Sequence, residues 1–436
     1  MAQPLTLKAY FDSQAQDLTD RCTRCGKCVE VCPILQSEYS PLKEAQPVEV
    51  VTGVVEFLRG GPLPREAQAW TEACMGSGEC ITHCPEHINP RLMLAIALSR
   101  LRAAKSQQGD NPFGDYFKRM SQIIKLATGM QMTPEAYRRL LGQDGRKARA
   151  EVVMYLGCNV LRTPVIAFSV LDILDRLGVD YAVVAGVANC CGMIHLKLHG
   201  DVEHGEVIAG GTLAKLASLR PEKVLHWCPT CVMQFGETIA GWRPQAFAFE
   251  HFSDYLVDRL DALRAMFVAP VRRRVALHRH EGGFDVYRNV ERLLQAIPGV
   301  EIVPIVEPHH LAYSCGPGGL GNVPAAREES HRQTLRSAVA AGAEILLTLY
   351  HTCHRDLCVF EGQYPLEVKN WTGLLAAALG LQEHEDRYKR YKLYSDINAI
   401  LEDAKEFLAA HKLDVSGIRE VLPGLLAGKE RGLSAW

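Results

Sequence analysis

The chain has 436 residues, of which 47% are hydrophobic and 22% charged, and its formal net charge is -2. This length exceeds what one hydrophobic core usually supports, so two or three domains are expected, and the near-neutral charge argues against nucleic-acid binding. The 15 cysteines predict metal or redox chemistry in the reducing cytoplasm rather than a disulfide scaffold, and we expect no signal peptide and no transmembrane segment.

The first functional signal is the run Cys22-x2-Cys25-x2-Cys28-x3-Cys32-Pro33, which has the spacing of bacterial ferredoxins. Three cysteines at this spacing bind one iron–sulfur cluster, whereas the fourth, before proline, reaches a second cluster. A zinc ribbon would need two separated CxxC pairs instead. The run therefore predicts half of a two-cluster domain.

A second run repeats this spacing with Ser77 in the place of the second cysteine. Crossed ligation between the two runs predicts two ligand groups. The first group is Cys22, Cys25, Cys28 and Cys84, and the second is Cys32, Cys74, Cys80 and Ser77. The second group then holds either a [3Fe-4S] cluster or a [4Fe-4S] cluster with serine or solvent at one iron. Helical patterns over 47–58 and 90–102 predict that this domain, residues 1–110, is α-helical.

Residues 111–149 are expected to be a connector, because turn-forming and basic stretches flank a short helical segment. From residue 150 onward, strand-like and helical runs alternate, which predicts a right-handed parallel sheet. The expected strands are 151–157, 181–187 and 223–226, and the expected helices are 163–178 and 205–219.

Five cysteines lie at the ends of these three strands: Cys158, Cys190, Cys191, Cys228 and Cys231. The carboxyl ends of parallel strands meet at one edge of the sheet, where ligands bind, so the five thiols are expected to gather there. Five thiols exceed the four that a tetrahedral zinc ion takes. The pattern therefore predicts an iron–sulfur cluster at this edge.

The pattern repeats over residues 269–375, with strands expected over 272–278, 300–306 and 345–349. Three of the five cysteine positions are then Glu281, Ser314 and Tyr350, so a second cluster of the same kind is not expected. Cys315 and Cys353 are candidate ligands for zinc or mononuclear iron, and small core cysteines are the alternative. Other potential ligands nearby are Cys358, His278, His280, His309, His310, His351 and His354.

The spacing Cys158-x31-Cys190-Cys191-x36-Cys228-x2-Cys231 resembles the cysteine-rich (CCG) domain of the catalytic subunit of heterodisulfide reductase. Related iron–sulfur subunits occur in glycolate oxidase and anaerobic glycerol-3-phosphate dehydrogenase. The resemblance covers about residues 20–375. It implies an α-helical two-cluster ferredoxin followed by two α/β domains with Rossmann-like parallel sheets. These domains would span residues 150–268 and 269–375, and residues 376–436 would form a helical tail.

The resemblance also implies that the five cysteines hold a noncubane [4Fe-4S] cluster, at which a disulfide or other sulfur–sulfur bond is cleaved or formed with electrons from the two N-terminal clusters. The alternative function is a relay of electrons from a flavoprotein dehydrogenase to quinone. Both functions imply redox partner subunits, either a flavoprotein or a membrane quinone-reactive subunit. Both also imply a cytoplasmic location. If a membrane subunit binds the chain, that location is the inner face of the membrane. The first also implies a disulfide or thiol substrate, for which His195 is a candidate proton donor.

Overall fold

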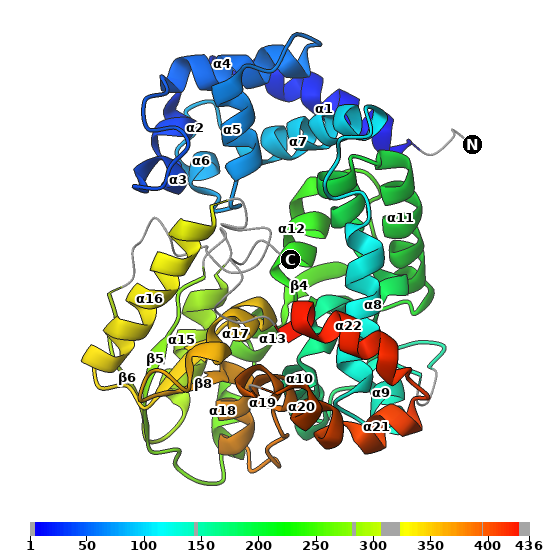
Figure 1. Cartoon of the computed structure of the whole chain (residues 1–436), viewed down its shortest axis with the longest axis vertical. Coiled ribbons are helices and arrows are strands. Elements are labelled where there is room, and N and C mark those ends of the chain that lie inside the picture. Colours follow the sequence, from blue (N-terminus) through cyan, green and yellow to red (C-terminus); the bar gives the residue numbers. More distant parts are fainter. Residues whose placement is uncertain (1–4, 144–146, 281–284, 307–322, 395, 427–436) are drawn as a thin grey trace.

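The computed structural model describes residues 5–143, 147–280, 285–306, 323–394 and 396–426. Along the chain, a helical N-terminal domain is followed by two parallel sheets with their helices and then by a helical tail (Figure 1). Within these ranges no helix combines the length and the apolar character that a membrane crossing requires.

The N-terminal domain is α-helical, as the sequence predicted. The helix expected over 47–58 is confirmed as α4, and the helix expected over 90–102 continues to Gln107. Buried valines of α4, among them Val50 and Val54, pack into a core that includes Trp70. The helices are α1 (Leu7–Arg21), α2 (Lys27–Glu30), α3 (Pro33–Gln36), α4 (Pro47–Leu58), α5 (Arg65–Ala73), α6 (Glu79–Thr82) and α7 (Pro90–Gln107).

The first sheet has four parallel strands in the order β2-β1-β3-β4. Every residue of the central strand β1 is buried, which explains its uninterrupted apolar sequence. The three expected strands are confirmed, although the one expected over 181–187 ends at Ala185, and a fourth, β4, was not expected. The strands are β1 (Val152–Gly157), β2 (Tyr181–Ala185), β3 (Lys223–His226) and β4 (Ala248–His251). The helical elements are η1 (Asn159–Arg162), α10 (Pro164–Arg176), η2 (Val187–Asn189), η3 (His195–His199), α11 (Val202–Ser218), α12 (Pro229–Met233), η4 (Gln234–Thr238), α13 (Phe252–Val257) and α14 (Leu260–Met266).

The second sheet has the same parallel arrangement, with the order β6-β5-β7-β8. The strand expected over 300–306 ends earlier, at Ile302, and the short edge strand β8 was not expected. The strands are β5 (Arg273–Leu277), β6 (Val300–Ile302), β7 (Ile345–Thr348) and β8 (Glu367–Asn370). The helical elements are α15 (Val286–Ala296), α16 (Pro324–Ala340), α17 (His351–Leu357), η7 (Cys358–Phe360) and α18 (Trp371–Ala378).

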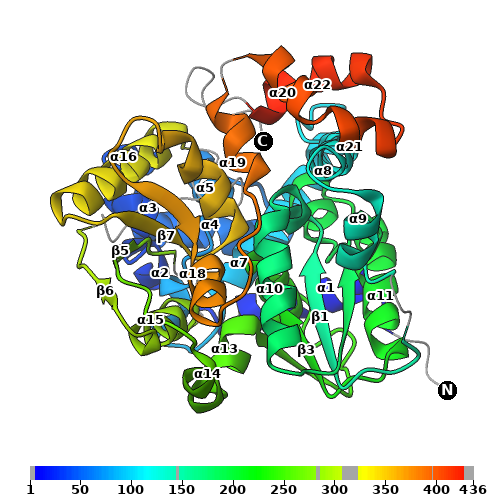
Figure 2. The same ribbon diagram turned by 90° about the horizontal axis from the view of Figure 1, so that it is seen from below.

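The two sheet domains pack against each other through aromatic side chains and through contacts between their helices. Trp227 and Trp371 stack with ring centroids 6.0 Å apart, and Phe252 lies 6.1 Å from Trp371. Helix α10 of the first domain packs on α18 of the second, and α13 packs on α15 (Figure 2). Because the stacked aromatic side chains are fully buried, their packing fixes the two sheets relative to each other.

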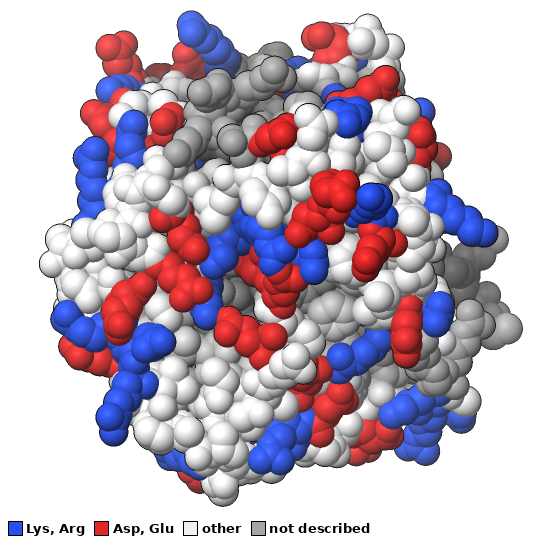
Figure 3. Space-filling model, turned by 60° about the horizontal axis from the view of Figure 1, so that its bottom comes forward, with Lys and Arg blue, Asp and Glu red and all other residues white. Residues whose placement is uncertain are grey.

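Residues 111–149 contain α8 (Tyr116–Gly129) and α9 (Pro134–Leu140), and α8 packs against the C-terminal tail. The hydroxyl of Tyr391 donates to the carbonyl of Met130 at 3.1 Å. The tail consists of α19 (Arg387–Leu393), α20 (Ile397–Asp403), α21 (Lys405–Ala410) and α22 (Val415–Leu426). On the face drawn in Figure 3, basic and acidic side chains are interspersed. Within the tail, Arg387 and Arg390 both pair with Asp403.

Candidate metal centre

The five cysteines of the first sheet domain come together at the carboxyl ends of β1, β2 and β3. Cys158 follows Gly157, whose φ of +72° and close approach to Cys231 require glycine: a Cβ there would lie 3.1 Å from Sγ of Cys231. Gly192 has a φ of +82°, and a Cβ there would lie 3.0 Å from the carbonyl oxygen of Gly205 on α11. These two glycines therefore allow the chain to close tightly around the thiols.

The thiols form one continuous series of sulfur contacts, from Cys158 through Cys190, Cys191 and Cys231 to Cys228. The hydrogen bond with Cys190, together with burial, raises the pKa of Cys158. Hydrogen bonds with Cys158 and Cys191 lower the pKa of Cys190 well below its ordinary value. Neighbouring thiols therefore cannot all ionise unless positive charge lies among them.

This donor set fits an iron–sulfur cluster. The five side chains are reduced, four of them are buried, and backbone N–H groups of Gly192 and Met193 point at Cys190 and Cys191. Iron ions bind thiolates and would supply the positive charge that the crowded sulfurs require. The site offers five adjacent sulfurs, whereas a tetrahedral zinc ion takes only four ligands.

Tyr155 is a neighbour of this site that the sequence did not indicate. Its hydroxyl donates to the carbonyl of Asn189 at 2.7 Å and lies 3.9 Å from Sγ of Cys231. Burial raises its pKa well above the ordinary value, and nearby Cys231 and Cys191 raise it further. The phenol therefore stays protonated beside the sulfurs.

The structure brings together the four cysteines of the first expected N-terminal group. Burial raises the pKa of Cys28 to about 12, and Cys22, Cys25 and Cys84 raise it further, so the four thiols lie within electrostatic range of one another. Cys25 is exposed, whereas Cys28 and Cys84 are buried. This group therefore reaches the protein surface at Cys25.

The cysteines of the second group also lie together. Burial raises the pKa of Cys32 to about 11, with a further contribution from Cys74, and both residues raise the pKa of Cys80, which burial has already raised. Cys28 acts on Cys80 as well, so the two groups are neighbours. Ser77 is buried in the turn between Cys74 and Cys80.

The turns that carry Cys25 and Ser77 have the same backbone shape. Arg24 and Gly26 both have positive φ, +59° and +81°, and the corresponding Gly76 and Gly78 have +80° and +87°. Each turn leads into a four-residue helix, α2 or α6. Ser77 therefore occupies the local position that Cys25 has in the first run.

Charged side chains join the second N-terminal group to the first sheet domain. The guanidinium of Arg91 donates from Nη1 to the carbonyl of Gly76 at 2.7 Å and pairs through Nε with Glu237 at 3.1 Å. Lys197, in the π-helical turn η3, lies within electrostatic range of Cys74 and Cys191. Nothing in the sequence indicated these contacts between the domains, because they join distant segments: Arg91 and Glu237 are 146 positions apart.

His195, the candidate proton donor, and His199 lie in the π-helical turn η3 with ring centroids 5.0 Å apart. Burial, followed by His204 and His199, lowers the pKa of His195 to about 4, although Cys190 acts in the opposite direction. The imidazolium form is therefore scarce near neutral pH. This works against the predicted proton donation, which stays a prediction.

In the second sheet domain, Cys353 and two histidines come together. Sγ of Cys353 lies 3.2 Å from Nδ1 of His280, and His278 completes a compact group. Cys315 lies outside the described residues, as do Glu281, His309, His310 and Ser314. Tyr350 is within electrostatic range of both Cys228 and Cys353, so the two sheet domains present these groups to each other.

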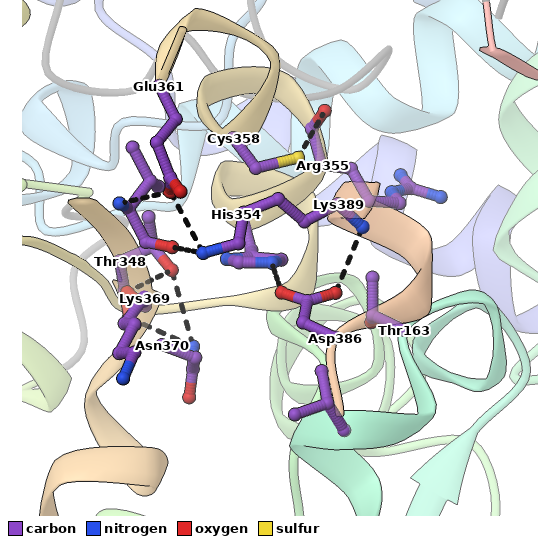
Figure 4. A network of polar contacts seen from close by, with 12 residues as sticks. Thr163, Thr348, His354, Arg355, Cys358, Glu361, Lys369, Asn370, Asp386 and Lys389 are labelled. Atoms are coloured by element: carbon purple, nitrogen blue, oxygen red, sulfur yellow. Dashed lines mark hydrogen bonds and ion pairs between the residues drawn. The ribbon is translucent and has the colours of Figure 1, made fainter. Parts of the chain in front are cut away.

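Cys358 belongs to a different environment (Figure 4). Its Sγ lies 3.9 Å from the carbonyl of Arg355, in a network that also contains His354, Asp386 and Lys389. Nε2 of His354 lies 2.6 Å from Asp386, and Nζ of Lys389 donates to Glu361 at 2.8 Å. This network ties α17 to the tail, and neither Cys358 nor His354 belongs to the compact group of His278, His280 and Cys353.

Comparisons with known protein families match three parts of the chain. The model of the 4Fe-4S dicluster domain matches residues 18–88. The model of the cysteine-rich domain matches twice, over residues 152–236 and 276–357. These matches make iron–sulfur clusters the cofactors of this chain.

The chain is 26% identical to a dihydromethanophenazine:CoB–CoM heterodisulfide reductase subunit of Methanosarcina mazei, over 83% of this chain and 94% of that protein. It is also 22% identical to a fumarate reductase (CoM/CoB) subunit of Methanothermobacter marburgensis, over 68% of this chain and 58% of that protein. A probable membrane-anchored ferredoxin of Chromohalobacter salexigens is 23% identical, over 83% of this chain and 60% of that protein. The chain is therefore a heterodisulfide reductase-like iron–sulfur protein, in which a ferredoxin-type dicluster domain precedes two cysteine-rich domains.

Proposed function

We propose that this chain is an oxidoreductase subunit that cleaves or forms a sulfur–sulfur bond at a noncubane [4Fe-4S] cluster held by Cys158, Cys190, Cys191, Cys228 and Cys231. The observation that carries the proposal is the continuous series of five sulfurs at one sheet edge. An adjacent cysteine pair in the middle of such a series can serve two different irons. Such a cluster, when bound, supplies one-electron chemistry next to a sulfur-binding metal.

The order of the cysteine groups supports a supply of electrons from the N-terminal domain. Cys25 of the first group is exposed, Cys28 neighbours Cys80 of the second group, and Lys197 lies near both Cys74 and Cys191. A partner redox subunit is therefore proposed to dock around Cys25. In line with the family resemblance, that partner is proposed to be a flavoprotein or a membrane quinone-reactive subunit.

The protein around the cysteines has two proposed tasks. Tyr155 keeps its proton and holds the carbonyl of Asn189, the residue before the cysteine pair. The hydroxyl of Thr212 donates to the carbonyl of Cys190 at 2.8 Å and fixes the same segment from α11. Together these bonds orient the cysteine pair, while the buried surroundings exclude water from the sulfurs.

The second candidate function is a relay of electrons from a flavoprotein dehydrogenase of a hydroxy acid or polyol to quinone. The series arrangement of the cysteine groups is equally compatible with a relay. The five-sulfur site favours sulfur chemistry, because a relay requires only ordinary cubane clusters. We further propose that both sheet domains are Rossmann-like units derived from one duplication, since they share one strand order.

Iron content tests the proposed function. Protein purified anaerobically should contain about 11 to 12 irons per chain if three clusters are present, and Mössbauer spectra should show the noncubane component. A content of about 7 to 8 irons per chain without that component would contradict the proposed active site and favour the relay function.

The variant Ser77→Cys should add a thiol at the position that corresponds to Cys25. Because the two turns share their backbone geometry, we expect the second cluster to become a fully cysteine-ligated [4Fe-4S] cluster. If the wild-type cluster has three irons, the iron content should rise by about one per chain and the [3Fe-4S] electron paramagnetic resonance signal of the oxidised protein should disappear. An unchanged signal would show that residue 77 does not face the cluster. Thr23→Cys, in the first turn, is the control and should leave the signal unchanged.

A further inference from the structure

His278, His280 and Cys353 form a compact group of metal-binding side chains in the second sheet domain. Their donor atoms all lie within 4.8 Å of one another, and Sγ of Cys353 lies 3.2 Å from Nδ1 of His280. His278 and Cys353 are fully buried, and His280 is partly buried. We propose that these three residues bind one zinc ion.

The strand pairing explains why the two histidines face Cys353. Val152 pairs with Lys223 in the first sheet, and Val275 pairs with Ile345 in the second. Counted from these pairs, His280 stands at the position of Gly157, and Cys353 stands at that of Cys231. A Cβ on Gly157 would lie 3.1 Å from Sγ of Cys231, so this position points at the thiol in both domains.

By the same count, His278 takes the position of Tyr155, whose hydroxyl lies 3.9 Å from Sγ of Cys231. The second domain therefore places an imidazole at each of the two positions that face Cys353. In the first domain, those positions hold a phenol and a glycine, neither of which is a usual ligand of zinc. With histidines at these two positions, the surroundings of Cys353 become a donor set of two nitrogens and one sulfur.

The donor set suits zinc better than an iron–sulfur cluster. Zinc is bound by thiolates and imidazoles together in known sites, such as those with two cysteines and one or two histidines, whereas iron–sulfur clusters are held mainly by thiolates. Binding releases the proton of Cys353, and two neutral imidazoles with one thiolate leave a net charge of +1. Three donors among the described residues leave a fourth tetrahedral position for water or another ligand.

The proposed zinc ion would lie close to the five-cysteine site. The ring of Tyr350 lies 5.1 Å from that of His280, and Tyr350 is within electrostatic range of both Cys228 and Cys353. Tyr350 therefore neighbours both groups. The inference depends on the second sheet domain alone and would survive failure of the proposed function.

The test uses the full chain produced with added zinc and purified anaerobically. Elemental analysis should give about one zinc per chain, and X-ray absorption at the zinc edge should show about one sulfur at 2.3 Å and two nitrogens at 2.0–2.1 Å. Cys353→Ser and His280→Gln should each reduce the zinc content to below about 0.1 per chain while the iron content stays at the wild-type value.

Cys358→Ala is the matched control, because Cys358 is equally buried and lies five residues from Cys353 but bonds to the carbonyl of Arg355. This variant should retain its zinc. Absence of zinc from the wild type, a zinc ion ligated by four sulfurs, or full zinc content in the His280→Gln variant would each overturn the proposal. His280 is partly exposed, so this variant decides the question even if Cys353→Ser fails to fold.

Discussion

Replacement of Cys191 by alanine is expected to abolish turnover of a disulfide or thiol substrate and to leave the spectroscopic signals of the N-terminal clusters intact. Cys191 is the middle member of the sulfur series, in contact with both Cys190 and Cys231. Its removal interrupts the series and withdraws a proposed ligand. Because loss of an outer partner of a metal site already costs about 10–100-fold, loss of a ligand should reduce turnover by more than about 100-fold.

The measurement is anaerobic turnover with a reduced dye as electron donor, together with electron paramagnetic resonance of the dithionite-reduced protein. Cys358→Ala is the control, since it removes a buried thiol that does not belong to the sulfur series and should keep wild-type turnover. Turnover of the Cys191→Ala variant at the wild-type rate would refute the proposed active site and favour the relay function.

The sequence was sufficient to predict the central strands and the gathering of the five cysteines. β1 is an apolar run that ends directly before Cys158, and the short strand β3 ends two residues before Cys228, so the parallel topology alone brings the thiols to one edge. The edge strands β4 and β8 were missed. Each has only four residues and contains polar side chains, as an edge strand that faces solvent on one side can, so the sequence carried little strand signal.

The contacts that complete the site depend on packing between distant segments. Tyr155 is one of several apolar-looking positions of β1, and only the fold shows that its hydroxyl reaches Cys231. His278 and His280 were visible as potential ligands, but the strand register was needed to show that both face Cys353. Residues 111–149 were expected to be a connector, and nothing in the sequence indicated that α8 packs on the tail. The two segments are far apart in the chain: Tyr391 is 261 positions from its hydrogen-bond partner Met130.

Removal of one partner from the Arg91–Glu237 ion pair is expected to destabilise the contact between the N-terminal domain and the first sheet domain. Only 4% of the Arg91 side chain and 15% of the Glu237 side chain are exposed. A buried charge without its partner costs about 3–5 kcal/mol. Arg91→Met and Glu237→Met should therefore each lower the free energy of unfolding by about this amount.

The double variant Arg91→Met/Glu237→Met should recover most of the lost stability, because two apolar side chains of similar length leave no charge buried. Arg264→Met, which removes an exposed pair with Asp261, is the control and should change the free energy of unfolding by less than about 1 kcal/mol. Anaerobic urea unfolding, followed by circular dichroism and by cluster absorbance, measures all four variants. Single variants as stable as the control would show that the pair does not hold the two domains together.

Arg91 also donates to Gly76, in the turn between Cys74 and Cys80, so its loss should affect the second cluster. The cationic guanidinium stabilises the negative charge that a cluster gains on reduction, and Arg91→Met should therefore lower the reduction potential of that cluster. The same variant should leave the potential of the first cluster unchanged, because that group lies further out, around the exposed Cys25. A redox titration that separates the two signals distinguishes this local effect from general unfolding, in which both signals would be lost together.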